Sequence, residues 1–84
     1  MPELARFYGI IIRMFLIDQE HPPRHIHIKY GDHEAVMSLN TLELIDGKLP
    51  NKCFQLVREW AELHQAELIE IWDTQKFHRV QPLE

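Results

Sequence analysis

The apolar residues of this chain change their spacing once, near residue 50. Before that point apolar side chains tend to alternate with polar ones, and after it they recur every three or four residues. The second period places the apolar side chains on one face of a helix, so we expect a helix over about residues 51–72. The stripe is formed by Val57, Trp60, Ala61, His64, Leu68, Ile71 and Trp72. The chain is therefore predicted to combine strands in its first half with one long C-terminal helix.

Strands are expected over residues 5–17, with a bend at Gly9, and over residues 25–30 and 34–39. Residues 25–30 alternate strictly, and the short connection after them favours an antiparallel return. A further strand is possible at 42–45, before the Asp46-Gly47 turn signal, and the tail 77–84 is compatible with an edge strand or an irregular segment. The predicted class is α+β: a small, mainly antiparallel sheet of about three to five strands covered by one long C-terminal helix.

Length and charge limit the function classes. A chain of 84 residues has room for one core, so a single domain over 1–84 is predicted. The formal net charge of −4 argues against binding nucleic acid over the whole surface and leaves only a local site. We find no apolar run long enough to span a membrane and no signal-peptide pattern, so we expect a cytoplasmic protein. The single Cys53 excludes a four-cysteine zinc site.

The densest chemical feature is a group of histidines at His21, His25 and His27. On a strand, His25 and His27 point to the same side, roughly 6–7 Å apart, which suits two imidazoles that converge on one ion. His64 could supply a third ligand from the apolar stripe of the helix, with His21 as the alternate, and the set would form a zinc site with an open position. The competing interpretation places His25 and His27 on a solvated face and makes His64 a hydrogen-bonded core residue.

The same histidines allow chemistry without a metal. His25 and His27 could act as general base and general acid near neutral pH, as a ribonuclease requires. Nearby cations would stabilise the negative charge of the phosphate, and the candidates are Arg13, Arg24 and Lys29. A nuclease or hydrolase that uses these histidines therefore stands beside the zinc hypothesis, and the sequence does not separate the two.

Three motifs are spread between residues 6 and 68 and together cover half of the chain. They are the strand sequence at residues 6–14, the His-Pro-Pro and His-x-His segment at residues 21–31, and the segment from residue 47 to residue 68 that contains Gly-Lys-Leu-Pro and most of the predicted helix. In these motifs the chain resembles a family of small bacterial proteins known as domain of unknown function 4160. The resemblance implies the fold class and brings no established activity with it.

The resemblance also implies a genetic context. Genes of that family commonly lie beside genes of a second small family, domain of unknown function 2442, in an arrangement like that of a toxin–antitoxin pair. By this resemblance the chain is expected to be one component, the toxin rather than the antitoxin, and to bind a small protein partner of the second family. Its working surface would be the loop and strand at residues 21–29. The alternatives are a metal-binding protein or hydrolase that uses the histidine cluster, and a non-enzymatic interaction module.

Overall fold

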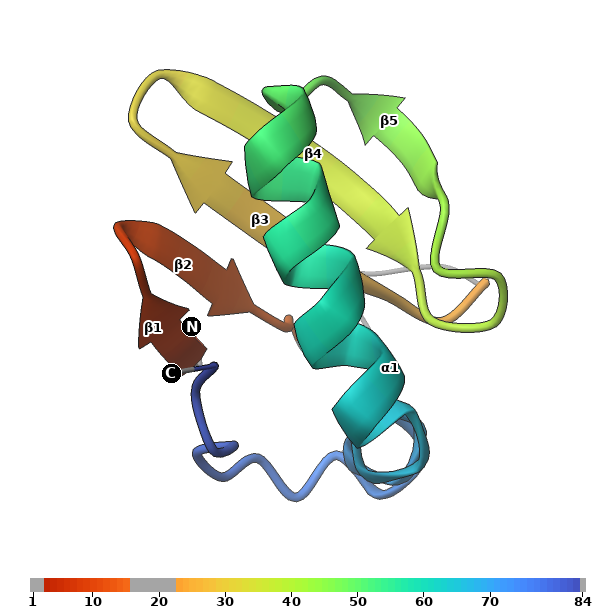
Figure 1. Cartoon of the computed structure of the whole chain (residues 1–84). Coiled ribbons are helices and arrows are strands. Elements are labelled where there is room, and N and C mark those ends of the chain that lie inside the picture. The colour runs from red at the N-terminus through yellow and green to blue at the C-terminus, as the bar shows by residue number, and fades with distance from the viewer. Residues whose placement is uncertain (1–2, 16–22, 84) are drawn as a thin grey trace.

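The computed structural model describes residues 3–15 and 23–83, which form one sheet and one helix (Figure 1). The elements are β1 (Glu3–Phe7), β2 (Ile10–Arg13), β3 (His25–Tyr30), β4 (His33–Ser38), β5 (Leu44–Gly47) and α1 (Asn51–Thr74). The sheet has five strands in the order β1-β2-β3-β4-β5, and every neighbouring pair is antiparallel. α1 lies across one face of the sheet (Figure 1). The α+β class, the antiparallel sheet and the C-terminal helix are confirmed.

The core lies between the sheet and α1, and alternate residues of the strands build it. In the centre of the sheet Ile12 on β2 is paired with Ile28 on β3, and Ile10 and Ile26 lie on the same face. None of these four side chains is more than 2% exposed. The alternation in the sequence therefore identified the inward faces of β2 and β3, because successive side chains of a strand point to opposite faces.

The inward face of α1 is anchored by tryptophan. Trp60 is fully buried, and its ring lies 5.7 Å from the ring of Phe7 on β1, centroid to centroid. The Trp60 Nε1–H donates a hydrogen bond of 2.8 Å to the carbonyl oxygen of Gln81 in the tail. α1 departs from helical dihedral angles at His64 (φ −118°, ψ 17°), which marks a kink in the middle of the helix.

The fifth strand differs from the prediction, since it covers Leu44–Gly47 rather than residues 42–45. A tight turn precedes it. The Ser38 hydroxyl accepts hydrogen bonds from the backbone N–H groups of residues 40 and 41, and Leu42 has a positive φ of 61°. The chain therefore turns through Leu42, and the strand begins two residues later than its apolar content suggests.

The tail continues from α1 along the outer edge of β1 (Figure 1). Residues 77–83 are irregular, but the N–H of Val80 donates a hydrogen bond of 2.7 Å to the carbonyl oxygen of Leu4. The Val80 side chain is only 2% exposed. Beside it, Arg79 forms an ion pair of 3.1 Å with Glu3. One backbone hydrogen bond and one ion pair thus join the tail to β1 without forming a sixth strand in the described part of the chain.

Candidate functional site

α1 covers one face of the sheet, and the opposite face carries a separate set of side chains. The strand register aligns Arg13 on β2, His27 on β3, Val36 on β4 and Asp46 on β5 in one row across this face. Paired residues of neighbouring strands point to the same face, so the row is a direct consequence of the pairing. We call this surface the open face, and we define it by Ile11, Arg13, Phe15, His27, Lys29, Glu34, Val36 and Asp46.

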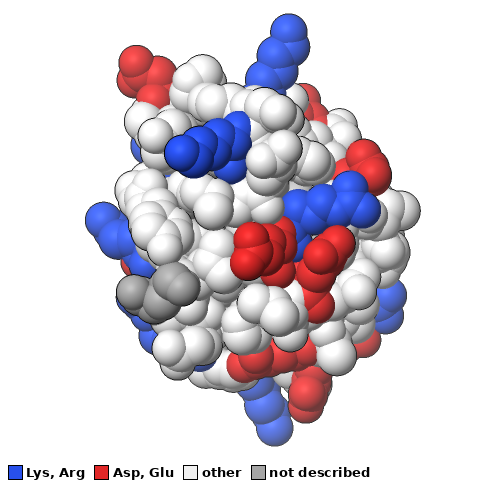
Figure 2. Space-filling model, viewed as in Figure 1, with Lys and Arg blue, Asp and Glu red and all other residues white. Residues whose placement is uncertain are grey.

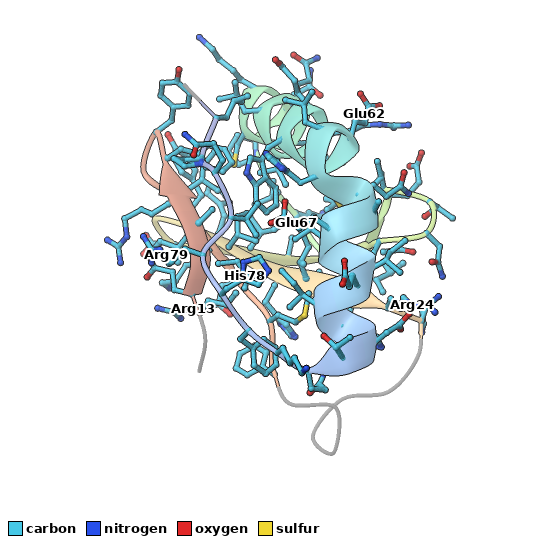
Figure 3. All side chains as sticks on the ribbon, turned by 90° about the horizontal axis from the view of Figure 1, so that it is seen from below. Arg13, Arg24, Glu62, Glu67, His78 and Arg79 are labelled. Carbon is cyan, nitrogen blue, oxygen red and sulfur yellow. The ribbon has the colours of Figure 1, made fainter. Side chains whose placement is uncertain are left out.

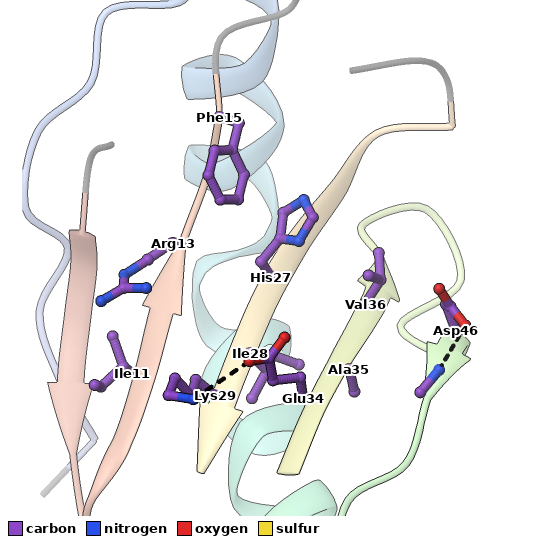
Figure 4. Close-up of a pocket in the computed structure, with 11 residues that line it drawn as sticks. Ile11, Arg13, Phe15, His27, Ile28, Lys29, Glu34, Ala35, Val36 and Asp46 are labelled. Atoms are coloured by element: carbon purple, nitrogen blue, oxygen red, sulfur yellow. Dashed lines mark hydrogen bonds and ion pairs between the residues drawn. The ribbon is translucent and has the colours of Figure 1, made fainter. Parts of the chain in front are cut away.

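A hollow of about 310 Å³ lies in the open face (Figure 4). Its lining combines apolar side chains from β2 and β4, such as Ile11 and Val36, with the charged side chains of Arg13, Lys29 and Glu34. A hollow of this volume lies at the small end of the range for ligand sites. It has room for one or two side chains or for one small anion.

Arg13 and Lys29 are the two cations that line the hollow, and of these Arg13 has no ion-pair partner among the described residues. It is half-buried, and it forms no ion pair with any residue in ranges 3–15 and 23–83. Glu3 lies opposite it in the register of β1 and β2 but is already bound by Arg6 at 2.9 Å and by Arg79 at 3.1 Å. The hydrogen bond from Arg6 outweighs partial burial and, with the contribution of Arg79, lowers the pKa of Glu3 to about 2. Glu3 is therefore fully ionised at neutral pH, and two other arginines hold its carboxylate.

The other predicted cations already have carboxylate partners. Lys29 lies in the hollow and forms an ion pair of 3.3 Å with Glu34 of β4. Arg24 donates two hydrogen bonds, of 2.8 and 3.1 Å, to the carboxylate of Asp73 near the end of α1. These hydrogen bonds raise the pKa of Arg24 and lower that of Asp73. Arg24 lies on the opposite side of the molecule from Arg13 (Figure 3), so the predicted set of anion-binding residues does not assemble in one place.

The structure places His25 and His27 side by side, with 5.1 Å between their ring centroids, but in different surroundings. His27 lines the hollow, where its ring meets the ring of Phe15 edge-on at 4.3 Å. His25 is only 8% exposed, and its ring packs 4.9 Å from that of Trp72 on α1. Its Nδ1 lies 2.8 Å from the carbonyl oxygen of Pro23, which can only accept, so Nδ1 carries the hydrogen. The interpretation that places His25 on a solvated face is therefore wrong, because the end of α1 buries this side chain.

The zinc site with His25, His27 and His64 is not assembled. Within residues 3–15 and 23–83, no three His, Cys, Asp or Glu side chains are grouped so that they could hold a metal ion. His64 instead lies 3.3 Å from the carboxylate of Glu67 and 5.5 Å, ring to ring, from Trp60. The alternate ligand His21 lies outside the described residues.

His78 of the tail lies close to the same carboxylate. Its Nδ1 is 3.9 Å from an oxygen of Glu67, and Figure 3 shows the two side chains facing each other between the tail and α1. His64 and His78 therefore flank one carboxylate, far from the open face. This contact was not expected from the sequence, because it depends on where the tail runs.

Of the residues that line the hollow, the sequence singled out only Arg13, His27 and Lys29 as site residues. Phe15, Glu34, Val36 and Asp46 line it together with Arg13 and His27. A signal for Phe15 was present, because the alternation of β2 places it on the same face as Arg13. For the residues of β4 and β5 the signal would have been the exact pairing of strands, which the sequence does not state.

These observations define a class: a small α+β protein whose antiparallel sheet is covered by a helix on one face and has a charged hollow in the other. The chain belongs to the family described as Domain of unknown function (DUF4160), which it matches over residues 9–73. No curated protein matches the chain, and no solved structure matches it. Within the described residues, no helix has both the length and the apolar character needed to cross a membrane.

Proposed function

We propose that this chain is the toxin-like component of a toxin–antitoxin pair and that its open face binds a small protein partner of the family known as domain of unknown function 2442. The observation that supports this binding surface concerns Arg13. It is a half-buried cation that lines the hollow, and no carboxylate among the described residues forms an ion pair with it. A guanidinium binds a carboxylate through two parallel hydrogen bonds. An acidic side chain of the partner would supply the acceptors that Arg13 lacks among the described residues.

Charge is distributed unevenly around the molecule, and this supports an acidic contact at Arg13. Four cations lie on the open face or at its rim and come from β1 to β3 and the tail: Arg6, Arg13, Lys29 and Arg79. The same elements bring one carboxylate, that of Glu3, to this region. β4 and β5 carry Glu34 and Asp46 on the same face. Figure 2 shows several carboxylates on the helix side. Four acidic residues of α1 are exposed: Glu59, Glu62, Glu70 and Asp73. A partner with an acidic patch would therefore be attracted to one half of the open face and repelled by the helix side.

The composition of the open face also suits protein binding. Arginine and aromatic residues are enriched at the centres of interfaces and carry much of their binding energy. Here Arg13 and the paired rings of Phe15 and His27 lie around one hollow. A side chain of the partner that fills the hollow would exclude water from these groups and strengthen the ion pair.

Calorimetric titration of the purified chain with the purified partner tests this surface. We expect the Arg13→Gln variant to bind with a Kd at least about tenfold higher than wild type, as for a central interface arginine. The matched control is Arg24→Gln, because Arg24 lies on the opposite side of the molecule from Arg13 and is bound by Asp73 of α1 (Figure 3). The control is expected to bind like wild type. Equal affinity of the two variants would remove Arg13 and the open face from the proposal.

The toxin role is tested separately by growth. Expression of the chain alone should slow the growth of host cells, and co-expression of the partner should restore it. A chain that forms the complex but has no effect on growth by itself would be an interaction module, and the toxin role would be withdrawn while the binding surface stands.

Phosphodiester hydrolysis is a second candidate, and the close approach of His25 and His27 favours it. In this role His27, which lines the hollow beside Arg13, would act as general base, and His25 would hold it in position. Cleavage of a labelled RNA by the purified chain should then fall at least about a hundredfold in His27→Ala. His33→Ala is the control, because His33 is exposed at the start of β4 and stacks on Tyr30. Full cleavage by His27→Ala would exclude this chemistry.

A further inference from the structure

The two edge strands of the sheet, β1 and β5, differ in what lies beside their outer edges. The outer edge of β1 is hydrogen-bonded by the tail, through the N–H of Val80 and the carbonyl oxygen of Leu4. β5 is the last strand at the other edge, and in the described part of the chain its only strand neighbour is β4. A strand with an unpaired edge presents a row of backbone donors and acceptors that can pair with another extended chain.

β5 is a short strand of four residues with a charged Asp46 and an irregular register against β4, but it lacks other features that protect an edge strand from such pairing. It contains no proline and no lysine, and Ile45 in its middle is 49% exposed. The register shifts between Val36 and Met37 of β4, so Ile45 has no paired position on that strand. A large apolar side chain thus lies exposed beside a free backbone edge.

A hollow of about 340 Å³ lies beside this edge. It is lined by three apolar residues, Leu44, Leu49 and Phe54, and by the polar residues Glu43 and Asn51. Leu44 belongs to β5 and Phe54 to the first turns of α1, so the edge strand and the helix both line the hollow. Figure 1 shows that α1 begins next to β5. Strand addition commonly combines backbone hydrogen bonds with a pocket that receives a side chain, and both elements are present here.

We propose that the edge of β5 and this hollow together receive an extended segment of the protein partner, which would pair with β5 as a sixth strand. The inference rests on the proposed function, because it identifies where that partner inserts its segment. An apolar side chain of the segment would enter the hollow, and its backbone would bond to β5. The segment would lie between the hollow on the helix side of β5 and the residues Asp46 and Gly47, which line the open-face hollow on the other side of the sheet.

Charge favours a basic segment over a second copy of this chain. Asp46 is exposed, and its neighbour on β4 is the uncharged Val36, so the cross-strand position on its other side is vacant for a Lys or Arg. Lys48 lies just after the end of β5, and Arg58 forms its ion pair with Glu43. Asp46 is the carboxylate of β5. It accepts a hydrogen bond from the N–H of Gly47 but forms no ion pair with a cation among the described residues. A second copy would bring its own net charge of −4 to this edge. A self-paired dimer is therefore disfavoured, and a partner segment with an apolar and a basic residue is favoured.

Amide hydrogen exchange of the purified chain, with and without the partner, tests the inference directly. We expect the backbone amides of residues 44–47 to exchange more slowly in the complex, because the outward N–H groups become hydrogen-bonded. Binding without added protection of residues 44–47 would overturn strand addition and leave the proposed function intact. Absence of binding would overturn both. Protection caused by a dimer of this chain alone, detected by light scattering without the partner, would also overturn the inference.

A pair of matched variants supplies the second readout. Ile45→Lys places a charged side chain in the middle of β5, a device by which natural edge strands avoid pairing. We expect it to raise the Kd for the partner at least about tenfold. The control is Leu63→Lys, which changes another exposed apolar residue, 68% exposed on α1, in the same way. Equal Kd values for the two variants would contradict the proposal, and the exchange experiment on the wild type does not depend on how well either variant folds.

Discussion

At the scale of single residues, Gly47 shows how closely this small sheet is packed. It lies at the end of β5, is paired with Ala35 of β4, and has a positive φ of 75°. A Cβ atom at this position would overlap the carbonyl oxygen of Glu34 and would lie 2.7 Å from the Cα of Ala35. Both obstacles are backbone atoms, which cannot rotate away. Any side chain here would therefore force β4 and β5 apart.

We predict that Gly47→Ala lowers the free energy of unfolding by about 3 kcal/mol or more, because backbone strain and a steric clash add together. Gly31→Ala is the control. Gly31 also has a positive φ, 58°, but nothing lies within 4 Å of a Cβ built there, so only the conformational cost of about 1 kcal/mol applies. Urea unfolding of both variants checks the difference, and similar losses in the two would show that the contact with β4 is unimportant.

Cys53 gives a second prediction at this scale. Its side chain lies in the first turn of α1, is 4% exposed, and belongs to the core cluster. Burial raises the pKa of the thiol, so the reactive thiolate is scarce at neutral pH. We expect slow modification of the native chain by a thiol reagent and rapid modification in denaturant, followed by absorbance. Rapid reaction of the native chain would show that the first turn of α1 opens readily.

At the scale of elements, the spacing of apolar residues predicted a strand or helix where that spacing decides which side chains are buried. It did not predict the bounds of an element whose position is fixed by a turn or by backbone contacts. The period of two identified the inward faces of β2 and β3, and the period near 3.6 identified α1. β5 was displaced, because its position depends on the left-handed turn at Leu42 and on the backbone fit of Gly47 against β4. Neither has a signal in the spacing of apolar residues.

The candidate site shows the same division. The alternation of residues 10–15 favours Arg13 and Phe15 on one face, and both line the hollow. It could not show that the end of α1 reaches His25 through Trp72, or that Asp73 captures Arg24, because both contacts depend on the direction in which α1 crosses the sheet. Site residues that come together from distant elements therefore required the structure.

The tail provides a prediction about one element. Val80 is buried against the core cluster, and its backbone N–H bonds to β1. Val80→Ala removes two buried methyl groups and should lower the free energy of unfolding by about 1.5 kcal/mol. For a domain of this size the melting temperature should fall by about 6–12 °C. Leu63→Ala, on the exposed side of α1, is expected to leave the melting temperature nearly unchanged. A Val80→Ala variant that melts like wild type would mean that the tail adds nothing to stability.

At the scale of the whole molecule, the match to the family divides the chain into two parts. Residues 9–73 contain β2 to β5, nearly all of α1, and every residue that lines the open-face hollow. β1 and the tail lie outside the match and pack on one another through Leu4, Val80, Glu3 and Arg79. The proposed binding surface therefore belongs to the matched part, whereas the contact between β1 and the tail joins the two ends of the described chain.

The carboxyl group of Glu3, which contacts both Arg6 of β1 and Arg79 of the tail, should make the stability of the whole molecule depend on pH. The arginines Arg6 and Arg79 lower the pKa of Glu3 from 4.5 to about 2 in the folded chain. A carboxyl whose pKa is lower in the folded state stabilises the fold above its unfolded pKa, and this stabilisation is lost as the pH falls from 4.5 toward 2. We therefore expect Glu3→Gln to be less stable than wild type at pH 7 and the difference to shrink below pH 4.5, measured by thermal melting across this range. Glu59→Gln, which removes an exposed carboxylate of α1 that forms no ion pair with the described residues, should keep the wild-type dependence on pH. A constant difference between Glu3→Gln and wild type from pH 7 to pH 2 would mean that the arginines do not stabilise the ionised form of Glu3.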